Sequence, residues 1–218
     1  MDVLWFRLPR RPGDGRDQIS FYLGGGLFIF LLDRGDEWQV GYGLLKGKFS
    51  EVKAAGLESL RNDLTRQVSW LGDRVSHLQD WKQVSVLSVE SSRVPQWHQP
   101  GLLLIGDAAH VMSPVGGVGI NYAIQDAVEA ANILAGPLKA GKVEESHLAQ
   151  VQQAREWPVK MIQRFQGYVQ EAVVKNALVK DRPFRLPCLA RFALKVPILR
   201  NLPAKMIAFG VRRARVRD

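Results

Sequence analysis

The residues best suited to chemistry lie in one segment, residues 106–126, where a carboxylate, a glycine-rich stretch and a helical pattern follow an apolar run. The apolar run at 102–105 is suited to a buried strand. Asp107 follows it after one residue, Gly106, at the strand end where ligands bind in α/β sheets. A carboxylate there can accept hydrogen bonds from ligand hydroxyls. Gly117 and Gly119, like Gly116 beside them, lack Cβ atoms, so a flat ligand can lie against the backbone.

A helix is predicted over residues 119–138, with alanines at 123, 127, 130, 131 and 135 that allow close packing. The first turn of a helix has free N–H groups and the positive end of the dipole. Such an end favours an anion, a phosphate or a delocalised negative charge. The segment therefore predicts a site for a flat ligand that carries hydroxyls and negative charge.

Several of these residues also have purely structural interpretations. Asp107 could cap a turn, and Asn121 could cap the start of the helix. His110 has the chemistry of a base, but no acid is evident near it, so we expect a structural, hydrogen-bonded histidine. Asp126 lies seven residues into the helix and is expected to pair with a cation or to cap a loop. We assign no residue a catalytic or metal-binding role.

The elements before this segment are predicted to be mostly strands. Residues 18–23, 27–33 and 38–44 are rich in aromatic and branched residues and are separated by turn signals, Gly24-Gly25-Gly26 and Arg34-Gly35-Asp36. This pattern predicts an antiparallel meander. The glycines either mark a hairpin turn, which we favour, or allow a ligand to approach.

Helices and a further strand are predicted around the meander and the glycine-rich segment. We expect a helix over residues 51–70 that is capped by Ser50, a short helix near 73–78 and strand character over 82–94. A second helical region is predicted over 144–180, broken or bent at Pro158. Prolines at 183, 187, 197 and 203 predict short helices joined by turns in the remainder.

Composition narrows the class of protein. The chain has 218 residues, of which 46% are hydrophobic and 23% charged, the balance of a soluble globular protein. Cys188 is the only cysteine, which favours a reducing compartment. The N-terminus has no apolar core of a signal peptide, and no apolar run is long enough for a membrane-spanning helix. We therefore expect a cytoplasmic protein.

The net charge of +9 belongs entirely to the tail. Residues 182–218 hold ten Lys or Arg and one Asp, so residues 1–181 sum to zero. This distribution argues against a nucleic-acid partner. Within the tail, Leu189, Phe192, Ala193, Val196 and Leu199 have roughly helical spacing. The tail is interpreted either as a helix packed on the domain, which we favour, or as a basic amphipathic segment in peripheral contact with a membrane.

The run G-D-A-A-H-x-x-x-P-x-x-G-x-G-x-N-x-x-x-x-D, residues 106–126, resembles the second FAD-binding motif of the para-hydroxybenzoate hydroxylase family of flavin-dependent aromatic hydroxylases. The match is tight over about 25 residues and looser on either side. The resemblance implies that Asp107 binds the ribityl chain of FAD and that Pro114 lies near the reactive edge of the isoalloxazine ring. Gly117 would lie against the cofactor. Backbone N–H groups of Gly119, Ile120 and Asn121 would face the pyrimidine end of the ring.

The resemblance also implies an activity. In such enzymes NAD(P)H reduces the flavin, O₂ forms a flavin hydroperoxide, and one oxygen passes to a substrate. The meander would cover the active site, which makes Phe21, Leu23, Phe28, Phe30 and Tyr42 candidates to face a small apolar or aromatic substrate. Strand alternation alone does not choose between this function and core packing for any of them.

Other motifs of that family are missing from this chain. The G-x-G-x-x-G unit that holds the FAD pyrophosphate and the central D-G motif have no counterpart, since residues 24–26 open no helix and Asp14-Gly15 lies in a polar turn. The expected fold is α+β, a partial α/β FAD-binding fold with an antiparallel meander and C-terminal helices but no N-terminal βαβ unit. We expect a β-rich region at 1–95, the FAD-binding segment at 96–140 and a helical region at 141–218.

The prediction is thus the C-terminal part of an FAD-dependent monooxygenase, incomplete on its own and in need of a complementing N-terminal half. Two alternatives stay open: a flavin-dependent halogenase or reductase of the same fold, and a non-catalytic fragment. The substrate, the choice between NADH and NADPH and the oligomeric state are not predicted.

Overall fold

The computed structural model describes residues 1–15, 19–114, 116–178, 205 and 209–217. The chain divides into two compact units. The first contains residues 1–89 and 170–185, and the second contains residues 90–169 and 186–218.

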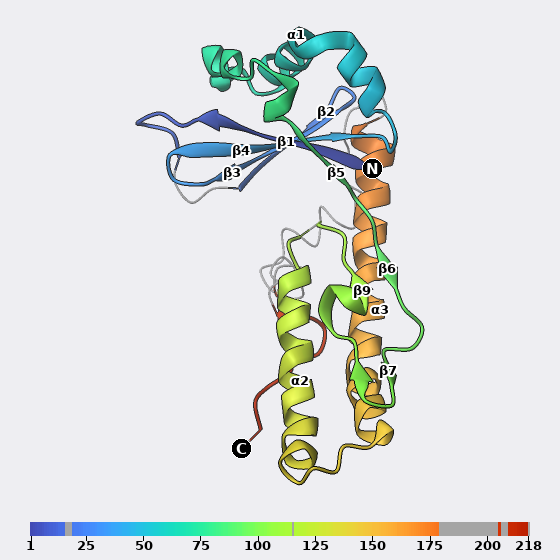
Figure 1. Ribbon diagram of the computed structural model, residues 1–218. Coiled ribbons are helices and arrows are strands. Elements are labelled where there is room, and N and C mark those ends of the chain that lie inside the picture. The colour runs from blue at the N-terminus through green and yellow to red at the C-terminus, as the bar shows by residue number, and fades with distance from the viewer. Residues whose placement is uncertain (16–18, 115, 179–204, 206–208, 218) are drawn as a thin grey trace, which may run out of the picture. The chain divides into compact units, whose positions relative to one another are not determined.

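The first unit is built on a five-stranded antiparallel sheet (Figure 1). Its strands lie in the order β2-β3-β4-β1-β5. Their bounds are Asp2–Pro9 for β1, Ile19–Gly24 for β2, Leu27–Asp33 for β3, Glu37–Leu44 for β4 and Ser85–Ser88 for β5. The predicted meander is confirmed as β2-β3-β4, although its first residue, Gln18, lies outside the described residues. Gly25 and Gly26 form the β2–β3 turn with φ of 59° and 79°, which confirms that these glycines mark a hairpin.

Strand β1 was not predicted, yet it lies inside the sheet and pairs with both β4 and β5. Its sequence alternates as a strand should. Leu4, Phe6 and Leu8 point to one face and are almost completely buried, while Trp5 and Arg7 point to the other.

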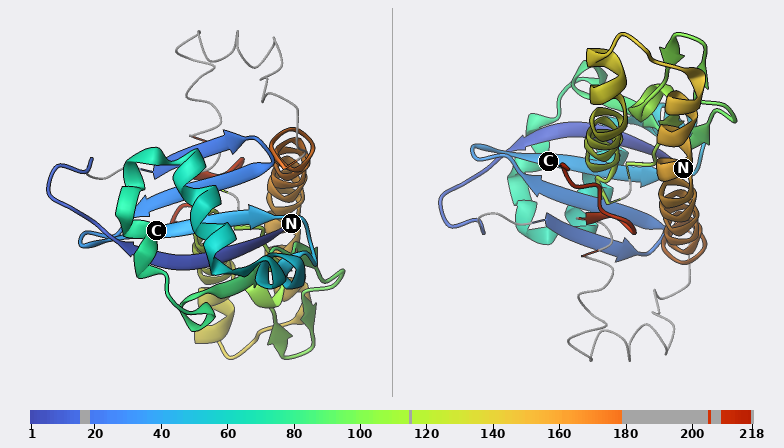
Figure 2. Two further views of the ribbon diagram at one scale, coloured as in Figure 1. Left: turned by 90° about the horizontal axis from the view of Figure 1, so that it is seen from above. Right: turned by 90° about the horizontal axis from the view of Figure 1, so that it is seen from below.

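Helical segments cover one face of this sheet (Figure 2, left). They are α1 (Phe49–Gln67) and the 3₁₀ segments η1 (Ser69–His77) and η2 (Trp81–Gln83). The core between these segments and the sheet includes the buried residues Leu4, Ile29, Leu31, Val40, Leu60, Leu64 and Leu71.

Two details of the predicted first helix are wrong. Ser50 does not cap it, because the helix begins at Phe49 and the capping position is Lys48, which makes no side-chain cap. Gly56 interrupts it with φ of 88° and ψ of 161°, so α1 consists of two helical parts joined by a kink.

The opposite face of the sheet carries an aromatic cluster. Phe28 and Phe30 on β3 lie over Gly43 and Gly41 of β4, where a Cβ atom would come within 2.6 Å and 2.1 Å of their rings. Phe21 and Trp5 extend the cluster, with ring centroids 6.0 Å and 5.0 Å from that of Phe30. The two glycines are required because the rings lie flat on the β4 backbone.

Tyr42, the fifth candidate for the substrate side, lies on the other face. It is buried in the core under the helices, where its hydroxyl donates to Asp63 Oδ2 at 2.8 Å. Burial and this hydrogen bond raise its pKa. The five residues could not all share one face, because Tyr42 pairs with Ile29 and not with Phe28 or Phe30.

A nearly buried polar cluster closes the far end of the first unit. Asp14 accepts hydrogen bonds from Trp38 Nε1 and Arg74 Nη2, both at 2.9 Å, and from the Arg11 amide at 3.0 Å. Burial by itself raises the pKa of Asp14, but these donors and the charge of Arg74 hold it below the ordinary value. The cluster ties η1 to the connection between β1 and β2.

The second unit combines two long helices with short two-stranded ladders. The ladders pair β6 (Ser92–Arg93) with β9 (His110–Val111) and β7 (His98–Gln99) with β8 (Leu102–Leu103). The strand predicted over 82–94 is therefore two shorter strands, β5 and β6. The buried strand predicted over 102–105 is a short hairpin arm instead, and Leu102 is 45% exposed.

The two helices are α2 (Gly119–Lys139), as predicted, and α3 (Glu145–Ala177). Of the break or bend predicted at Pro158, the break is wrong, because α3 continues through this residue. Pro158, Val159 and Ile162 are buried, and we attribute the continuity to this packing, which offsets the lost hydrogen bond. Trp97, Met112, Val118 and Tyr122 pack around them, so the glycine-rich segment lies directly on the core.

Most of the basic tail, including Cys188 and the five apolar residues with helical spacing, lies outside the described residues. Residues 209–217 are described and contact α2. Among the helices that the structure describes, none is both long and apolar enough to cross a membrane.

Candidate functional site

Asp107 lies in η3 (Gly106–Ala108), the single 3₁₀ turn that follows β8. Its side chain is exposed, and among the described residues it forms no hydrogen bond or ion pair. The alternative role of a turn cap is therefore not supported. The carboxylate is free to accept hydrogen bonds from a ligand.

Gly106 fixes this turn against α2. Its φ of 59° lies in the left-handed region, and a Cβ atom there would lie 3.1 Å from the Ala123 Cβ atom of α2. The position thus demands glycine both for its backbone angles and for close packing. Because Ala123 lies one turn into α2, Asp107 is brought to the start of that helix.

The glycine-rich stretch forms a tight turn before α2. The Gly117 amide donates to the Pro114 carbonyl oxygen at 3.0 Å, and Gly116 and Gly117 have φ of 83° and 61°. Pro114, Gly116 and Gly117 are all exposed, and no atom of the described residues lies within 4 Å of the place where a Gly117 Cβ atom would be. The surface of the turn is therefore open backbone.

In the part of the chain that the structure describes, the first turn of α2 has no side-chain cap. Val118 occupies the capping position and makes no cap hydrogen bond, and no acidic residue lies in the turn. Asn121 consequently does not cap the helix. The amides of Gly119, Ile120 and Asn121 keep their donor capacity and the positive end of the helix dipole for a ligand.

Directly behind these residues lies a buried polar triad, His110, Asp126 and Arg155. Asp126 Oδ2 accepts hydrogen bonds from His110 Nε2 at 2.6 Å and from the Gly106 amide at 3.1 Å, and Asp126 Oδ1 accepts one from Arg155 Nε at 2.8 Å. All three side chains are at most 1% exposed. The expected structural roles are confirmed, since His110 is hydrogen-bonded to Asp126 and Asp126 is paired with the cation Arg155. The expectation of no acid near His110 is wrong, because α2 brings Asp126 to it.

The environment of Asp126 sets its charge. Burial by itself raises its pKa, but the hydrogen bonds from His110 and Arg155 and the charge of His110 outweigh burial, so the pKa lies below the ordinary 3.8. Trp97 closes the other side of His110, with ring centroids 5.0 Å apart. Asp126 is therefore an ionised structural anchor for the turn that bears Asp107.

Sequence reasoning missed a row of glutamines on α3 that hold the surrounding backbone. Gln166 Nε2 donates to the Ser113 carbonyl oxygen at 2.7 Å, directly before Pro114. Gln163 Nε2 donates to the carbonyl oxygens of Ser92 and Val111, and Gln152 Nε2 to that of Pro95. The sequence signal was weak, because glutamines on a helix normally face water.

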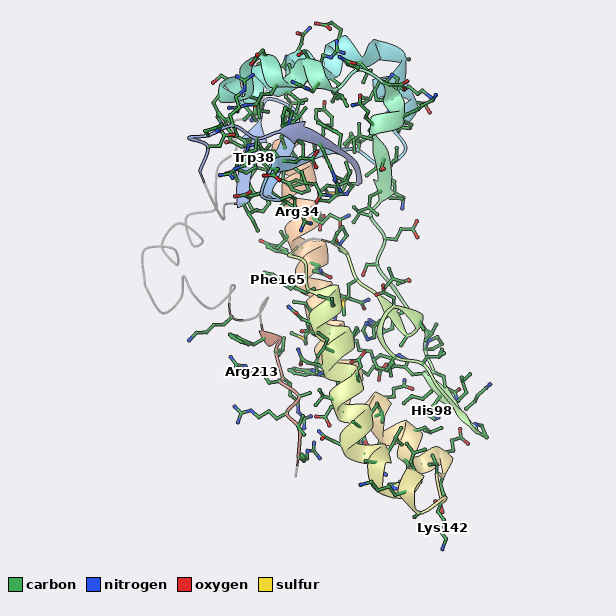
Figure 3. All side chains as sticks on the ribbon, turned by 60° about the vertical axis from the view of Figure 1, so that its left-hand side comes forward. Arg34, Trp38, His98, Lys142, Phe165 and Arg213 are labelled. Carbon is green, nitrogen blue, oxygen red and sulfur yellow. The ribbon has the colours of Figure 1, made fainter. Side chains whose placement is uncertain are left out.

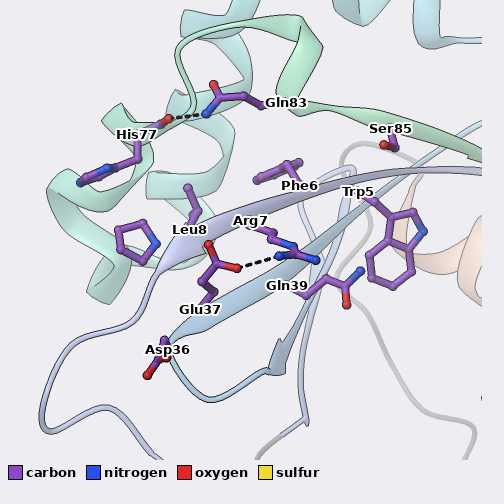
Figure 4. A pocket seen from close by; sticks show the side chains of 11 residues that line it. Trp5, Phe6, Arg7, Leu8, Asp36, Glu37, Gln39, His77, Gln83 and Ser85 are labelled. Carbon is purple, nitrogen blue, oxygen red and sulfur yellow. Dashed lines mark hydrogen bonds and ion pairs between the residues drawn. The ribbon is translucent and has the colours of Figure 1, made fainter.

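A separate hollow of about 700 Å³ opens on the first unit (Figure 4). Its lining comes from the free end of β1, the start of β4 and the 3₁₀ segments, and includes the Arg7–Glu37 ion pair of 3.0 Å. None of its lining residues is among those predicted to bind flavin.

Comparison with known proteins agrees with the motif. The sequence model of a family described as "FAD binding domain" matches residues 50–165. The chain is 30% identical over its full length to 6-methylpretetramide 4-monooxygenase of Streptomyces rimosus and covers 51% of that protein.

Solved structures share the fold. A probable FAD-dependent monooxygenase of Pseudomonas aeruginosa, PqsL, superposes with a TM-score of 0.66 at 20% identity, over 79% of this chain and 48% of that one. The flavin-dependent halogenase CmlS superposes with a TM-score of 0.60 at 18% identity, over 99% of this chain and 41% of that one.

The chain thus spans about half the length of the relatives it matches. It contains the uncapped helix start, the open glycine turn and the free carboxylate described above, and the matching family model covers all three. The chain belongs to the FAD binding domain family and corresponds to part of the larger, para-hydroxybenzoate hydroxylase-like FAD-dependent aromatic monooxygenases.

Proposed function

We propose that this chain supplies the flavin-ring and substrate side of an FAD-dependent monooxygenase that uses NAD(P)H and O₂ to hydroxylate a small aromatic or apolar substrate. The observation that carries the proposal is the free carboxylate of Asp107 beside the uncapped start of α2. A hydroxyl-bearing chain and a ring that becomes anionic on reduction would satisfy both features at once.

The residues present fit FAD position by position. Asp107 would accept hydrogen bonds from the ribityl hydroxyls. The backbone amides of Gly119, Ile120 and Asn121 would bind the pyrimidine end of the ring, and Pro114 would lie near its reactive edge. Gly117 leaves the backbone open to a flat ring, since a Cβ atom there would meet open space.

When bound, FAD would supply the chemistry: hydride acceptance from NAD(P)H and, once reduced, activation of O₂ for transfer of one oxygen atom. The role of this chain would be to bind and orient the ring and to stabilise its negative charge through the helix dipole. We assign no side chain the role of an acid or base. The buried His110 is held by Asp126 and would act only on the structure of the turn.

The aromatic cluster supports an aromatic substrate. Phe21, Phe28 and Phe30 share one face of the sheet with Trp5, and Phe21 is 60% exposed. Aromatic faces of this kind favour stacked or edge-to-face contact with a planar ligand. The Pseudomonas aeruginosa protein has been solved with 2-aminobenzoylacetate, which points in the same direction.

Binding of the flavin is tested by adding FAD in excess to the isotope-labelled chain and recording backbone amide signals. We expect shifts at residues 107, 117 and 119–121. Asp107→Ala should weaken binding by about tenfold or more, the loss expected for a hydrogen bond to a charged group. Asp36→Ala, at an exposed aspartate on the β3–β4 turn, is the matched control and should leave binding unchanged. Shifts confined to other residues, or equal binding by Asp107→Ala, would contradict the proposed site.

Activity is tested with the chain joined to an N-terminal half that carries the G-x-G-x-x-G unit. Oxidation of NAD(P)H that depends on an aromatic substrate, together with a product heavier by one oxygen atom, is the expected result. Flavin binding without such oxidation would favour the non-catalytic alternative. A halogenated product, formed in the presence of halide, would favour the halogenase alternative.

A further inference from the structure

The C-terminal residues 209–217 run beside α2 in an extended path, with Arg213 on this segment (Figure 3). Asn132 of α2 binds its main chain at two points. Asn132 Nδ2 donates to the Arg215 carbonyl oxygen at 2.7 Å, and the Arg217 amide donates to Asn132 Oδ1 at 3.0 Å. One side-chain amide thus pairs with the segment as a neighbouring strand would.

Two further positions on the same stripe of α2 receive the segment. Glu129, whose side chain is only 9% exposed, pairs with Arg217 Nη2 at 3.1 Å. Gln125 Nε2 donates to the Phe209 carbonyl oxygen, and Gln125 Oε1 accepts from the Ala214 amide, both at 3.4 Å. Polar residues at 125, 129 and 132 fall on one helix face, which would otherwise be an unusual place for a nearly buried glutamate.

Gly210 fits the segment closely to this face. A Cβ atom there would lie 3.2 Å from both the Tyr122 hydroxyl and Gln125 Nε2, and its φ of 74° favours glycine. The segment is therefore packed by shape as well as by hydrogen bonds.

Arg155 of α3 connects the segment to the turn that bears Asp107. Its Nη1 atom donates to the Arg212 carbonyl oxygen at 3.4 Å and to Gln125 Oε1 at 3.3 Å. Its Nε atom donates to Asp126 Oδ1 at 2.8 Å, and Asp126 Oδ2 accepts from the Gly106 amide at 3.1 Å. A chain of three hydrogen bonds through two buried side chains thus joins the segment to Gly106.

We propose that residues 209–217 are a positioning element for the flavin site, and that Arg155 is the positioning residue that transmits their docking, through Asp126, to the Gly106–Asp107 turn. The functional meaning of this inference rests on the proposed function, because that turn is the one proposed to hold FAD. When the segment detaches, Arg155 loses its carbonyl acceptor and Glu129 loses its cation. Water can then reach the triad, and the turn opens more often.

Hydrogen–deuterium exchange of the full chain, without FAD, tests the inference. In Asn132→Ala we expect exchange about tenfold faster in residues 209–217, as expected for the loss of two hydrogen bonds of ordinary strength. We also expect clearly faster exchange in residues 105–109, although residue 132 does not contact them. Gln153→Ala, the same change of an amide at an exposed position of α3, should leave both regions unchanged.

Arg217→Ala provides an independent variant, since the Arg217 side chain is 64% exposed and its removal should leave the core packing intact. It should produce the same pattern more weakly. Faster exchange of the segment with an unchanged turn would overturn the inference, and so would an unchanged segment in both variants. Because the measurement needs no flavin, failure of FAD binding would count against the proposed function alone.

Discussion

Asp126 is completely buried, and its two oxygens accept hydrogen bonds from donors on three other elements: η3, β9 and α3. A single carboxylate therefore holds the Gly106 amide, His110 and Arg155 in place. Removing its charge would leave Arg155 buried without a counter-charge, which is among the costlier changes that a protein interior can undergo.

For Asp126→Asn we expect a loss of about 3 to 5 kcal/mol in the free energy of unfolding, the range for breaking a buried ion pair. Chemical denaturation followed by circular dichroism measures it. The control is Glu156→Gln, which makes the same change in the more exposed Lys160–Glu156 pair and should cost at most about 1 kcal/mol. Equal losses in the free energy of unfolding would show that the buried triad stabilises the chain no more than an exposed ion pair does.

The contribution of Asp126 should also be visible in how the stability of the chain depends on pH. Because the pKa of Asp126 is lowered in the folded state, its contribution is present above the unfolded value of 3.8 and is lost as pH falls from there through the lower folded value. Asp14 contributes in the same direction from the first unit. The unfolding midpoint of Asp126→Asn should therefore fall less steeply below pH 3.8 than that of the unchanged chain, with the Asp14 part remaining.

At the scale of elements, strands β3 and β4 fit together because β4 has no side chain at two positions, Gly41 and Gly43. Phe30 and Phe28 fill the room that side chains at 41 and 43 would need. The two strands can pack in this way only because β4 offers bare backbone there.

Gly41→Ala should destabilise the chain by about 1 to 3 kcal/mol, since the added Cβ atom would lie 2.1 Å from the Phe30 ring. Adding Phe30→Leu to the same chain should recover part of that loss, because the smaller side chain vacates the space. Thermal unfolding of the two variants and of Phe30→Leu alone would measure the coupling. Additive effects in the double variant would mean that the clash is relieved by another route.

The elements that the sequence predicts well are those with local signals. The alternation and glycine turns of β2, β3 and β4 lie within one stretch, as do the alanines of α2. Strand β1 was missed although Leu4, Phe6 and Leu8 alternate, because only its pairing with strands about 35 and 80 residues away makes it part of a sheet. The break at Pro158 was wrong because packing, which local propensity does not contain, keeps α3 continuous there. The cap at Ser50 was wrong because the helix begins one residue earlier, at Phe49.

In the candidate site, too, the features formed by residues close in sequence were predictable, and those formed by tertiary packing were not. The free carboxylate of Asp107, the open turn and the uncapped helix follow from residues close together in the sequence. The triad does not, because Asp126 and Arg155 are 29 residues apart and meet only when α2 and α3 pack together. Arg155 carried no sequence signal beyond being a charged residue on a helix.

At the scale of the whole molecule, the chain spans about half the length of its relatives and contains no G-x-G-x-x-G unit. The pyrophosphate of FAD normally binds backbone amides and the helix dipole at such a unit. Contacts to the ring and ribityl chain alone should therefore hold the cofactor only weakly.

We expect the chain, expressed alone, to purify without a stoichiometric amount of flavin. Absorption spectroscopy of the purified protein, before and after denaturation to release any ligand, measures the content. Joining the complementing N-terminal half should restore a yellow protein. A clear flavin spectrum from the chain alone would show that the ring side is sufficient for tight binding.

The glutamines of α3 affect which loop substitutions such a protein can accept during evolution. Gln152, Gln163 and Gln166 donate hydrogen bonds to backbone carbonyl oxygens. A backbone carbonyl oxygen is present whatever side chain its residue carries. Mutations at the exposed residues Ser92, Pro95 or Val111 can thus change the side chains that the loops present without removing these hydrogen bonds to the helix. Related proteins could therefore differ in these loop side chains, and so in the ligands they bind, while the hydrogen bonds from α3 keep the loops in place.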